Sequence, residues 1–170
     1  MDDLTGRKEL LEASGLKKGH ILDIGMGDCG CMSFFLAKRG FDVIGIDRSP
    51  NAVHNSRKDA EKEKFSGKFE AKLADAENLP FKDNEFDAVS AYHSLHHMDK
   101  VDKVIDEMFR VCKENGFVLI ADFNEAGRKE YEHELDNGEF LETLESFLNK
   151  HAKEIRKVET KYNMMFICRK

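Results

Sequence analysis

The segment ILDIGMGDCG, residues 21–30, decides the fold of this 170-residue chain. In it an apolar run stops at an acidic residue, and a glycine-rich turn follows. After about one helix's length of chain comes VIGID, residues 43–47, a second apolar run that also ends in an acid. This order predicts a strand, a tight turn, a helix and a second strand.

Such a unit is the nucleotide-binding half of a Rossmann-type fold. Asp47 lies 22 residues beyond Gly25. At the tip of the second strand, its carboxylate can accept hydrogen bonds from both hydroxyl groups of a ribose. The segment therefore predicts that the chain binds a molecule containing adenosine.

The rest of the chain continues the alternation of strands and helices. Strands are expected at residues 20–24, 42–46, 68–73, 86–91 and 117–121. Helices are expected over residues 2–14 and 30–39, from Ser49-Pro50 onward, from an Asp99 cap onward, and along a segment carrying Phe140, Leu141, Leu144, Phe147 and Leu148. Two final strands, 154–161 and 164–169, must pair antiparallel because their connection is so short. The expected fold is α/β, a three-layer αβα sandwich around a mostly parallel seven-stranded sheet with a C-terminal antiparallel hairpin.

Composition predicts one globular domain over residues 1–170. The chain is 41% hydrophobic and 35% charged, and its length allows about two-thirds of the unfolded surface to be buried. Its net charge of -6 gives no gain from releasing the counterions of a nucleic acid, which is therefore a disfavoured partner. Neither a signal peptide nor a membrane-length apolar run is present, so a cytoplasmic location and no membrane partner are expected.

The four cysteines are expected to be reduced. Cys29, Cys31, Cys112 and Cys168 form no CxxC pair and are too few for a disulfide framework, which fits a reducing compartment. Cys112 and Cys168 are most simply core residues.

The glycine spacing alone would favour a dinucleotide, because residues 25–30 match G-x-G-x-x-G. Two features oppose that interpretation. Asp23 and Asp28 would place carboxylates beside a bound pyrophosphate, whereas a ligand with an amino group and a sulfonium would be attracted there. Asp75, followed by Ala76 just past the third strand, can accept a hydrogen bond from an adenine amino group.

Five strings resemble one family as a set. In order, they are LDIGMGDCG, VIGIDRSP, LADAENLPF, FDAVSAYHSLHHM and EMFRVCKENGFVLIADF. Across residues 20–122 the chain resembles the class I S-adenosylmethionine-dependent methyltransferases, close to the type 11 (UbiE-like) group. The resemblance implies a Rossmann-like methyltransferase sandwich, S-adenosyl-L-methionine as cofactor and S-adenosyl-L-homocysteine as product. The family usually has its third glycine where this chain has Cys29.

The resemblance also implies the cofactor-binding residues. The methionine part would lie by Asp23, Gly25 and Gly27, the ribose by Asp47 with Arg48 beside it, and the adenine by Asp75 and Ala76. Tyr92 and His93 would line the wall near the sulfur. With Met26 in the same turn, the set is Asp23, Gly25, Met26, Gly27, Asp47, Arg48, Asp75, Ala76, Tyr92 and His93.

The histidines after the fourth strand have three interpretations. With Cys29 and Cys31, His93 and His96 could hold a metal, but a sequence does not show ligands converging, and no metal site is predicted. A hydrogen-bonded histidine could simply brace the loop. Our prediction is that His96 acts as a general base, since imidazole titrates near neutral pH.

The expected reaction is an in-line displacement of the methyl group, for which positioning dominates. A small molecule is the predicted acceptor and a protein side chain the alternative. A nucleobase amine is disfavoured, because the chain is acidic and no Asp/Asn-Pro-Pro-Tyr/Phe element, which methyltransferases of exocyclic base nitrogens often have, follows the fourth strand. The candidate acceptor-side residues are Phe123, Asn124, Arg128 and Tyr131. Little chain is left to cover the acceptor, which predicts either a large acceptor or closure by a second copy in a homodimer.

Three other classes remain open at this stage. A nicotinamide-dependent oxidoreductase would bind NADH. A catalytically silent methyltransferase-like subunit would bind the cofactor but transfer nothing. A metal-binding protein would carry metal when purified.

Overall fold

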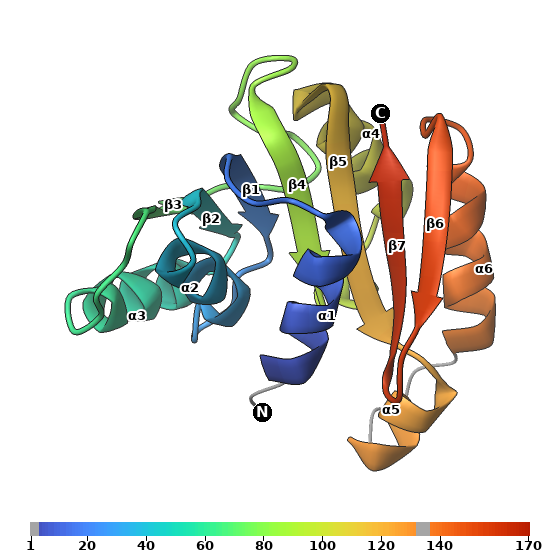
Figure 1. The fold of residues 1–170 in the computed structure, drawn as a ribbon, viewed down its shortest axis with the longest axis horizontal. Coiled ribbons are helices and arrows are strands. Elements are labelled where there is room, and N and C mark those ends of the chain that lie inside the picture. The colour runs from blue at the N-terminus through green and yellow to red at the C-terminus, as the bar shows by residue number, and fades with distance from the viewer. Residues whose placement is uncertain (1–3, 132–136) are drawn as a thin grey trace.

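The computed structural model describes residues 4–131 and 137–170 and contains a seven-stranded sheet in the order β3-β2-β1-β4-β5-β7-β6 (Figure 1). The strands are β1 (His20–Ile24), β2 (Asp42–Asp47), β3 (Lys68–Leu73), β4 (Phe86–Tyr92), β5 (Cys112–Phe123), β6 (Glu154–Glu159) and β7 (Asn163–Arg169). The first five pair in parallel, and β7 is antiparallel to both β5 and β6. The expected α/β fold with a terminal hairpin is confirmed.

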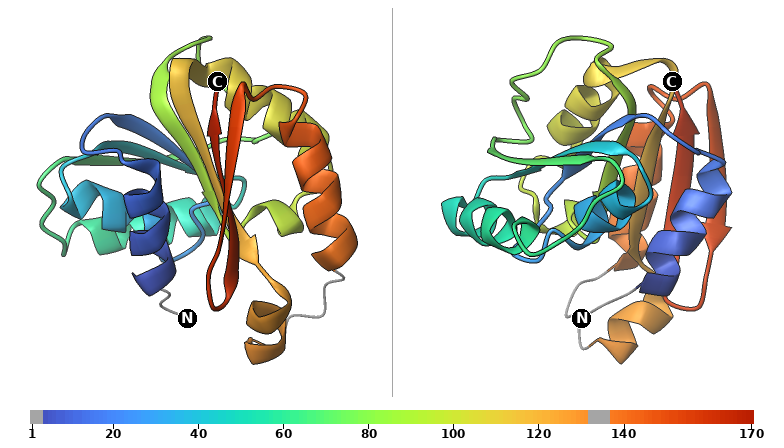
Figure 2. Two further views of the ribbon diagram at one scale, coloured as in Figure 1. Left: turned by 45° about the vertical axis from the view of Figure 1, so that its right-hand side comes forward. Right: turned by 60° about the vertical axis from the view of Figure 1, so that its left-hand side comes forward.

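Helices cover both faces of the sheet (Figure 2). On one face lie α1 (Leu4–Ser14), α2 (Cys31–Lys38) and α3 (Pro50–Ala60), and on the other α4 (Val101–Val111) and α6 (Asn137–Leu148). A 3-10 turn, η1 (Leu95–His97), follows β4, and α5 (Glu125–Glu130) follows β5. Within the described ranges, no helix has the length and apolar character needed to span a bilayer.

Several element ends differ from the sequence prediction by one or two residues, among them those of β2, β4 and β6, and two differences have a clear local cause. Helix α4 begins at Val101 with Lys100 as its N-cap, so Asp99 does not cap it. Strand β5 begins at Cys112, not Phe117, because Cys112 pairs with Phe86 before residues 113–116 bulge out of register. Asn115, with a φ of 61°, makes that bulge. The Asn-Gly pair therefore interrupts a strand instead of preceding it.

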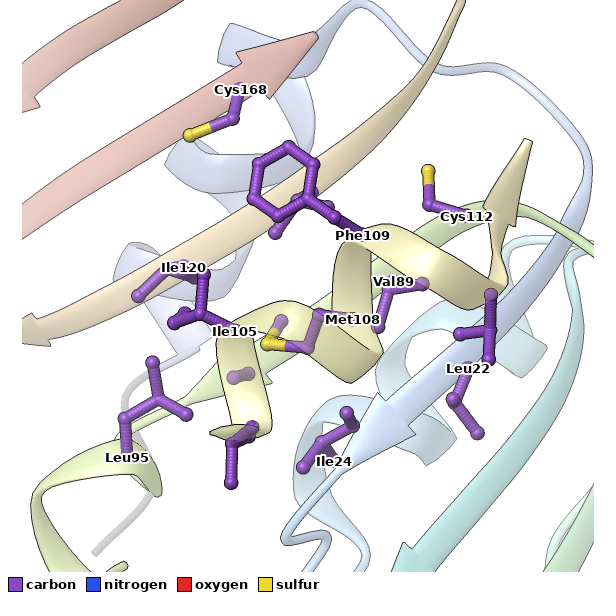
Figure 3. Close-up of a cluster of buried hydrophobic side chains, with 14 of the residues drawn as sticks. Leu22, Ile24, Val89, Leu95, Ile105, Met108, Phe109, Cys112, Ile120 and Cys168 are labelled. Carbon is purple, nitrogen blue, oxygen red and sulfur yellow. The ribbon is translucent and has the colours of Figure 1, made fainter. Parts of the chain in front are cut away.

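The core between the sheet and α4 fixes the position of the strand ends (Figure 3). Ile105 and Met108 of α4 are fully buried and belong to the same cluster as Val89 of β4 and Ile120 of β5. Cys112 and Cys168 are buried core residues, as predicted. Residues of β1, β4 and β5 share this one cluster with α4, so the core holds the carboxyl ends of the three strands beside one another.

Candidate active site

The carboxyl ends of the strands form the site, at the point between β1 and β4 where the strand order reverses. Open α/β sheets bind ligands at such a switch point. Two cavities of about 330 and 340 Å³ lie here and have Gly25, Gly27, His93 and His97 in common. A ligand long enough to occupy both would pass over the glycine-rich turn.

Asp47 is fixed on the wall of the first cavity. Its Oδ2 accepts a hydrogen bond from the backbone N–H of Gly27 at 3.0 Å, and its Oδ1 accepts one from Ser49 N–H at 2.9 Å. The same carboxylate therefore ties the turn after β1 to the end of β2. Its remaining lone pairs can accept hydrogen bonds from a diol.

Gly25 lets the turn after β1 pack tightly against the loop that follows β4. Its φ of 71° lies in the left-handed region, and a Cβ added there would be only 2.6 Å from Ser94 Cβ. Ser94 is held in place because its hydroxyl donates to Ile24 O at 2.8 Å. Only glycine fits this position, and its bare backbone forms part of both cavities.

The loop after β3 forms another wall of the first cavity. Asp75 and Ala76 line it, and Asp75 Oδ1 accepts a hydrogen bond from Glu77 N–H at 2.9 Å, which tightens the turn. Arg48 lines the same cavity and forms an exposed ion pair with Asp99 at 3.4 Å. An exposed pair of this kind contributes little to stability.

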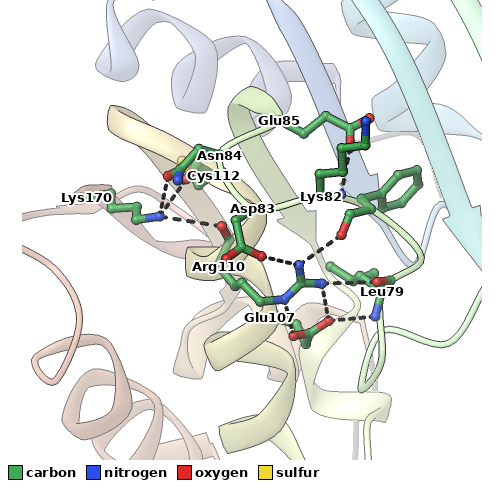
Figure 4. A network of polar contacts seen from close by, with 10 residues as sticks. Leu79, Lys82, Asp83, Asn84, Glu85, Glu107, Arg110, Cys112 and Lys170 are labelled. Atoms are coloured by element: carbon green, nitrogen blue, oxygen red, sulfur yellow. Dashed lines mark hydrogen bonds and ion pairs between the residues drawn. The ribbon is translucent and has the colours of Figure 1, made fainter.

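An arginine on α4 holds that loop from behind (Figure 4). The Arg110 guanidinium donates to Leu79 O at 3.0 Å and to Phe81 O at 2.9 Å, and it is paired with Glu107. Glu107 in turn accepts from Leu79 N–H at 2.7 Å. The Arg110 hydrogen bond keeps the pKa of Glu107 below its ordinary value.

We expect Arg110→Ala to loosen this wall. The substitution leaves two loop carbonyls and Glu107 without their charged donor, so the free energy of unfolding should fall by about 2–4 kcal/mol. Affinity for an adenosine ligand should fall with it. Urea denaturation and calorimetry measure the two effects. Arg110→Lys is the matched control, because a lysine keeps the charge but not the fork of donors; a lysine variant equal to wild type would contradict this account.

Asp23 lies beneath the turn with both oxygens engaged. Its Oδ2 accepts from the Ser33 hydroxyl at 2.6 Å and its Oδ1 from the Ser90 hydroxyl at 2.8 Å. The residue is 1% exposed, and burial raises its pKa from 3.8 to about 6. Asp23 thus joins α2 to β4 across β1, and it also lines the second cavity.

The raised pKa predicts an unusual dependence of stability on pH. Between pH 3.8 and 6 the folded chain holds the Asp23 proton more tightly than the unfolded chain does, so this stabilisation is complete below pH 3.8 and is lost as pH rises through 6. The loss should reach about 3 kcal/mol. Asp23→Asn should remove that component, measured as the wild-type minus variant difference in urea unfolding from pH 4 to 7. A difference independent of pH would refute the prediction.

Aromatic side chains form much of the second cavity. His93 has a left-handed φ of 52°, and its Nε2 lies 2.6 Å from Asn163 Oδ1. The centroid of its ring lies 3.9 Å from the ring centroid of Phe123 and 4.3 Å from that of Tyr92. Met26 lines the cavity too, although it is 5% exposed and packs mainly against the core beneath α3.

His96 lines the second cavity and pairs with a buried carboxylate. Its Nδ1 lies 2.7 Å from Asp122 Oδ1, and the two side chains are 2% and 0% exposed. Because an ionised carboxylate only accepts hydrogen bonds, this contact places the ring hydrogen on Nδ1 and makes Nε2 the basic nitrogen. Phe123 N–H, at 2.9 Å from the same Oδ1, fixes the carboxylate.

The predicted acceptor-side residues separate into two groups. Phe123 and Tyr131 line the second cavity. Asn124 instead caps α5, accepting from Gly127 N–H at 2.9 Å, and donates to Thr160 O in the terminal hairpin. Arg128 lines neither cavity.

Among the residues of the site that were missed in the sequence, two are polar and well buried. Asp122 was not singled out, although it lies at the end of an apolar strand as Asp23 and Asp47 do, a pattern that predicts a place at the site. Arg7 of α1 is 5% exposed, lines the second cavity and donates to Cys31 O at 3.0 Å. The sequence around Arg7 contains no pattern that predicts this contact, because its partner lies 24 residues away.

The expectation that all four cysteines are reduced is wrong. The sulfur atoms of Cys29 and Cys31 are joined in a disulfide within the glycine-rich turn. The two residues are separated only by Gly30, whose left-handed φ of 54° folds the chain back between them. Among the described residues, no group of three or more His, Cys, Asp or Glu side chains could hold a metal ion.

The ten predicted cofactor-binding residues and the predicted base His96 all line one or both cavities. A family model described as a methyltransferase domain matches residues 22–120, more than half of the chain. The chain belongs to the class I S-adenosylmethionine-dependent methyltransferases, type 11. Membership implies S-adenosylmethionine as the cofactor of this methyltransferase domain.

Individual relatives agree with the family. The chain is 33% identical to the ubiquinone/menaquinone biosynthesis C-methyltransferase UbiE of Pseudomonas putida, over 70% of this chain and 48% of the relative. It is 30% identical to the erythromycin 3''-O-methyltransferase of Saccharopolyspora erythraea, over 67% of this chain and 38% of the relative. It thus spans less than half the length of either. A SAM-dependent methyltransferase structure from Aquifex aeolicus shares the fold, with a TM-score of 0.77, 22% identity, and coverage of 96% of this chain and 88% of that one.

Proposed function

We propose that residues 1–170 form one domain that binds S-adenosylmethionine across the two cavities and transfers its methyl group to a hydroxyl of a small molecule. The observation that supports this proposal is the buried His96–Asp122 pair, of which His96 lines the second cavity. That cavity adjoins the one where Asp47 and Asp75 can receive an adenosyl group.

The residues present fit this cofactor. Gly25 and Gly27 line both cavities, along the path that the ligand would take over the turn, and Asp47 supplies oxygens for a ribose diol. Asp75 supplies an oxygen for an adenine amino group. When bound, S-adenosylmethionine supplies a methyl group activated by its sulfonium.

His96 is proposed to take the proton of the acceptor hydroxyl. As the new carbon–oxygen bond forms and the carbon–sulfur bond breaks, that proton passes to His96 Nε2, and the Asp122 carboxylate stabilises the imidazolium. A carbon or amine acceptor that loses no proton in the transfer step would make no use of such a pair. The dyad therefore favours an oxygen acceptor.

The relatives' names support the small-molecule class. One relative is named as a C-methyltransferase of ubiquinone/menaquinone biosynthesis and another as an erythromycin 3''-O-methyltransferase. The aromatic wall formed by Tyr92, Phe123 and Tyr131 suits an acceptor with a flat apolar surface. A protein side chain is the alternative acceptor, and a homodimer remains a prediction that light scattering tests.

The test is transfer of a labelled methyl group from S-adenosylmethionine to a panel of hydroxylated small molecules, including sugars and phenols. Formation of S-adenosylhomocysteine together with a labelled methyl ether would support the proposal. Label found only on nitrogen or carbon acceptors would contradict the proposed oxygen acceptor. Cofactor binding without transfer to any acceptor in the panel, or to protein, would favour a silent subunit.

A further inference from the structure

The Cys29–Cys31 disulfide lies where two cavities meet. Both cysteines line the second cavity, beside Asp23 and His93, and both also line a third cavity of about 810 Å³. Residues of α1, α2 and α3 form that third cavity. A reagent in the third cavity can therefore reach the disulfide without entering the proposed cofactor site.

The other two cysteines of the chain are protected from the same chemistry. Cys112 and Cys168 are fully buried, and burial raises the pKa of each thiol to about 12. Because the thiolate is the reactive form, neither should react at neutral pH in the folded chain. Cys29, in contrast, is exposed, and Cys31 is partly exposed. Thiol chemistry is thus confined to the turn.

The disulfide also constrains the turn that would carry the cofactor. It closes a ring across Gly30 directly before α2, which begins at Cys31. On one side of this ring Gly27 N–H is bonded to Asp47, and on the other Arg7 is bonded to Cys31 O. When the sulfur–sulfur bond opens, only such hydrogen bonds hold the turn in place.

We propose that Cys29 and Cys31 form a thiol–disulfide exchange site for low-molecular-weight thiols, and that the closed disulfide organises the turn for cofactor binding. The second part rests on the proposed function. In the exchange, two thiols attack in succession: the Cys29–Cys31 bond takes up two electrons and two protons to give two thiols, and the attacking thiols are oxidised to their own disulfide.

Charge around the third cavity favours anionic thiols. Four basic side chains line it against two acidic ones; they are Arg7, Lys38, Arg39 and Lys62 against Asp59 and Glu63. Exchange proceeds through a thiolate. A thiol compound that carries further negative charge should associate with this cavity faster, because basic side chains are in excess there. Glutathione should therefore reduce the disulfide faster than cysteamine does at equal thiolate concentration, and added salt should narrow the difference.

Coupling to the cofactor site must be reciprocal. If the closed disulfide raises affinity for S-adenosylhomocysteine by about fivefold, then saturating S-adenosylhomocysteine must make the disulfide harder to reduce by the same factor. The factor in ligand affinity and the factor in the reduction equilibrium are equal because both express one coupling free energy. Damage to the protein by the reductant would change the affinity without producing this equality.

The experiment uses the full chain purified without reductant. Alkylation, digestion and mass spectrometry first establish whether Cys29 and Cys31 are joined, with Cys112 and Cys168 as unpaired internal controls. Titration with S-adenosylhomocysteine before and after dithiothreitol then gives the two dissociation constants. A dithiothreitol redox buffer, with and without the ligand, gives the equilibrium constant of reduction. The double variant Cys29→Ser/Cys31→Ser should bind like the reduced chain and ignore dithiothreitol.

We expect the joined peptide, a dissociation constant about fivefold or more higher after reduction, and an equal shift in the reduction equilibrium. Finding both cysteines alkylated in the unreduced, air-exposed protein would overturn the exchange site. Equal affinity in the two redox states would overturn the coupling while leaving the proposed function intact. If neither state bound the ligand, the proposed function and the coupling would fail together, and the exchange site would still be decided by the mass analysis.

Discussion

Replacing His96 by alanine should lower kcat for methyl transfer to a hydroxyl acceptor by about 10²- to 10⁴-fold, the usual contribution of a positioned general base. The cause is specific: His96 lines the second cavity, and its pair with Asp122 at 2.7 Å sets which ring nitrogen takes the proton. Affinity for S-adenosylhomocysteine should change much less than kcat, since the first cavity, where the adenosyl group would lie, does not include His96. Steady-state kinetics and calorimetry separate the two quantities.

A second variant and a surface control distinguish a base from a structural residue. Asp122→Asn should also lower kcat while leaving the ligand affinity nearly unchanged. His151→Ala, at a surface histidine that pairs with Asp106, is the matched control. Retention of more than a third of the wild-type kcat in His96→Ala would remove His96 from the mechanism.

Replacing Asp47 by alanine should weaken binding of S-adenosylhomocysteine by about 10²-fold or more. Two hydroxyl hydrogen bonds to a carboxylate are lost, each worth about 1.5–3 kcal/mol. The backbone N–H groups of Gly27 and Ser49 also lose their acceptor, so the turn is less well held. Calorimetric titration measures the change, and circular dichroism shows whether the variant is folded.

Asp99→Ala is the control for charge. Asp99 also lines the first cavity, but its side chain is 78% exposed and forms an ion pair with Arg48. Removing it takes away the same unit of negative charge without touching the turn, so affinity should change less than about threefold. Equal losses in the two variants would mean that general electrostatics, not a bound diol, explains the effect of Asp47.

Much of this fold was predictable because its signals are local. The β1 and β3 boundaries agree with the sequence prediction. In β1 an apolar run ends at the glycine-rich turn, and β3 ends just before Ala74-Asp75. Ser49 and Pro50 start α3 as expected, with Ser49 accepting from Ala52 N–H. The predicted start of β5 was wrong because Asn115 and Gly116 belong to a bulge within the strand. A bulge uses the same residue types as a turn between two elements, so the sequence does not distinguish them.

The site was predictable only in part, because pairs of residues distant in sequence complete it. His96 was a candidate because imidazole is a common general base. Its partner Asp122 is brought beside it by the parallel pairing of β4 and β5. The Cys29–Cys31 bond depends on the left-handed Gly30 between them, which a CxC spacing does not reveal. Asp23 and its two serines come from three different elements.

The most direct test of the central claim is calorimetric titration of the purified chain with S-adenosylhomocysteine and, separately, with NADH. The cavities over Gly25 and Gly27 and the carboxylates of Asp47 and Asp75 predict one site for S-adenosylhomocysteine and no binding of NADH. Binding of NADH without S-adenosylhomocysteine would contradict the account, because it would make the G-x-G-x-x-G turn a pyrophosphate site despite Asp23 and Asp28.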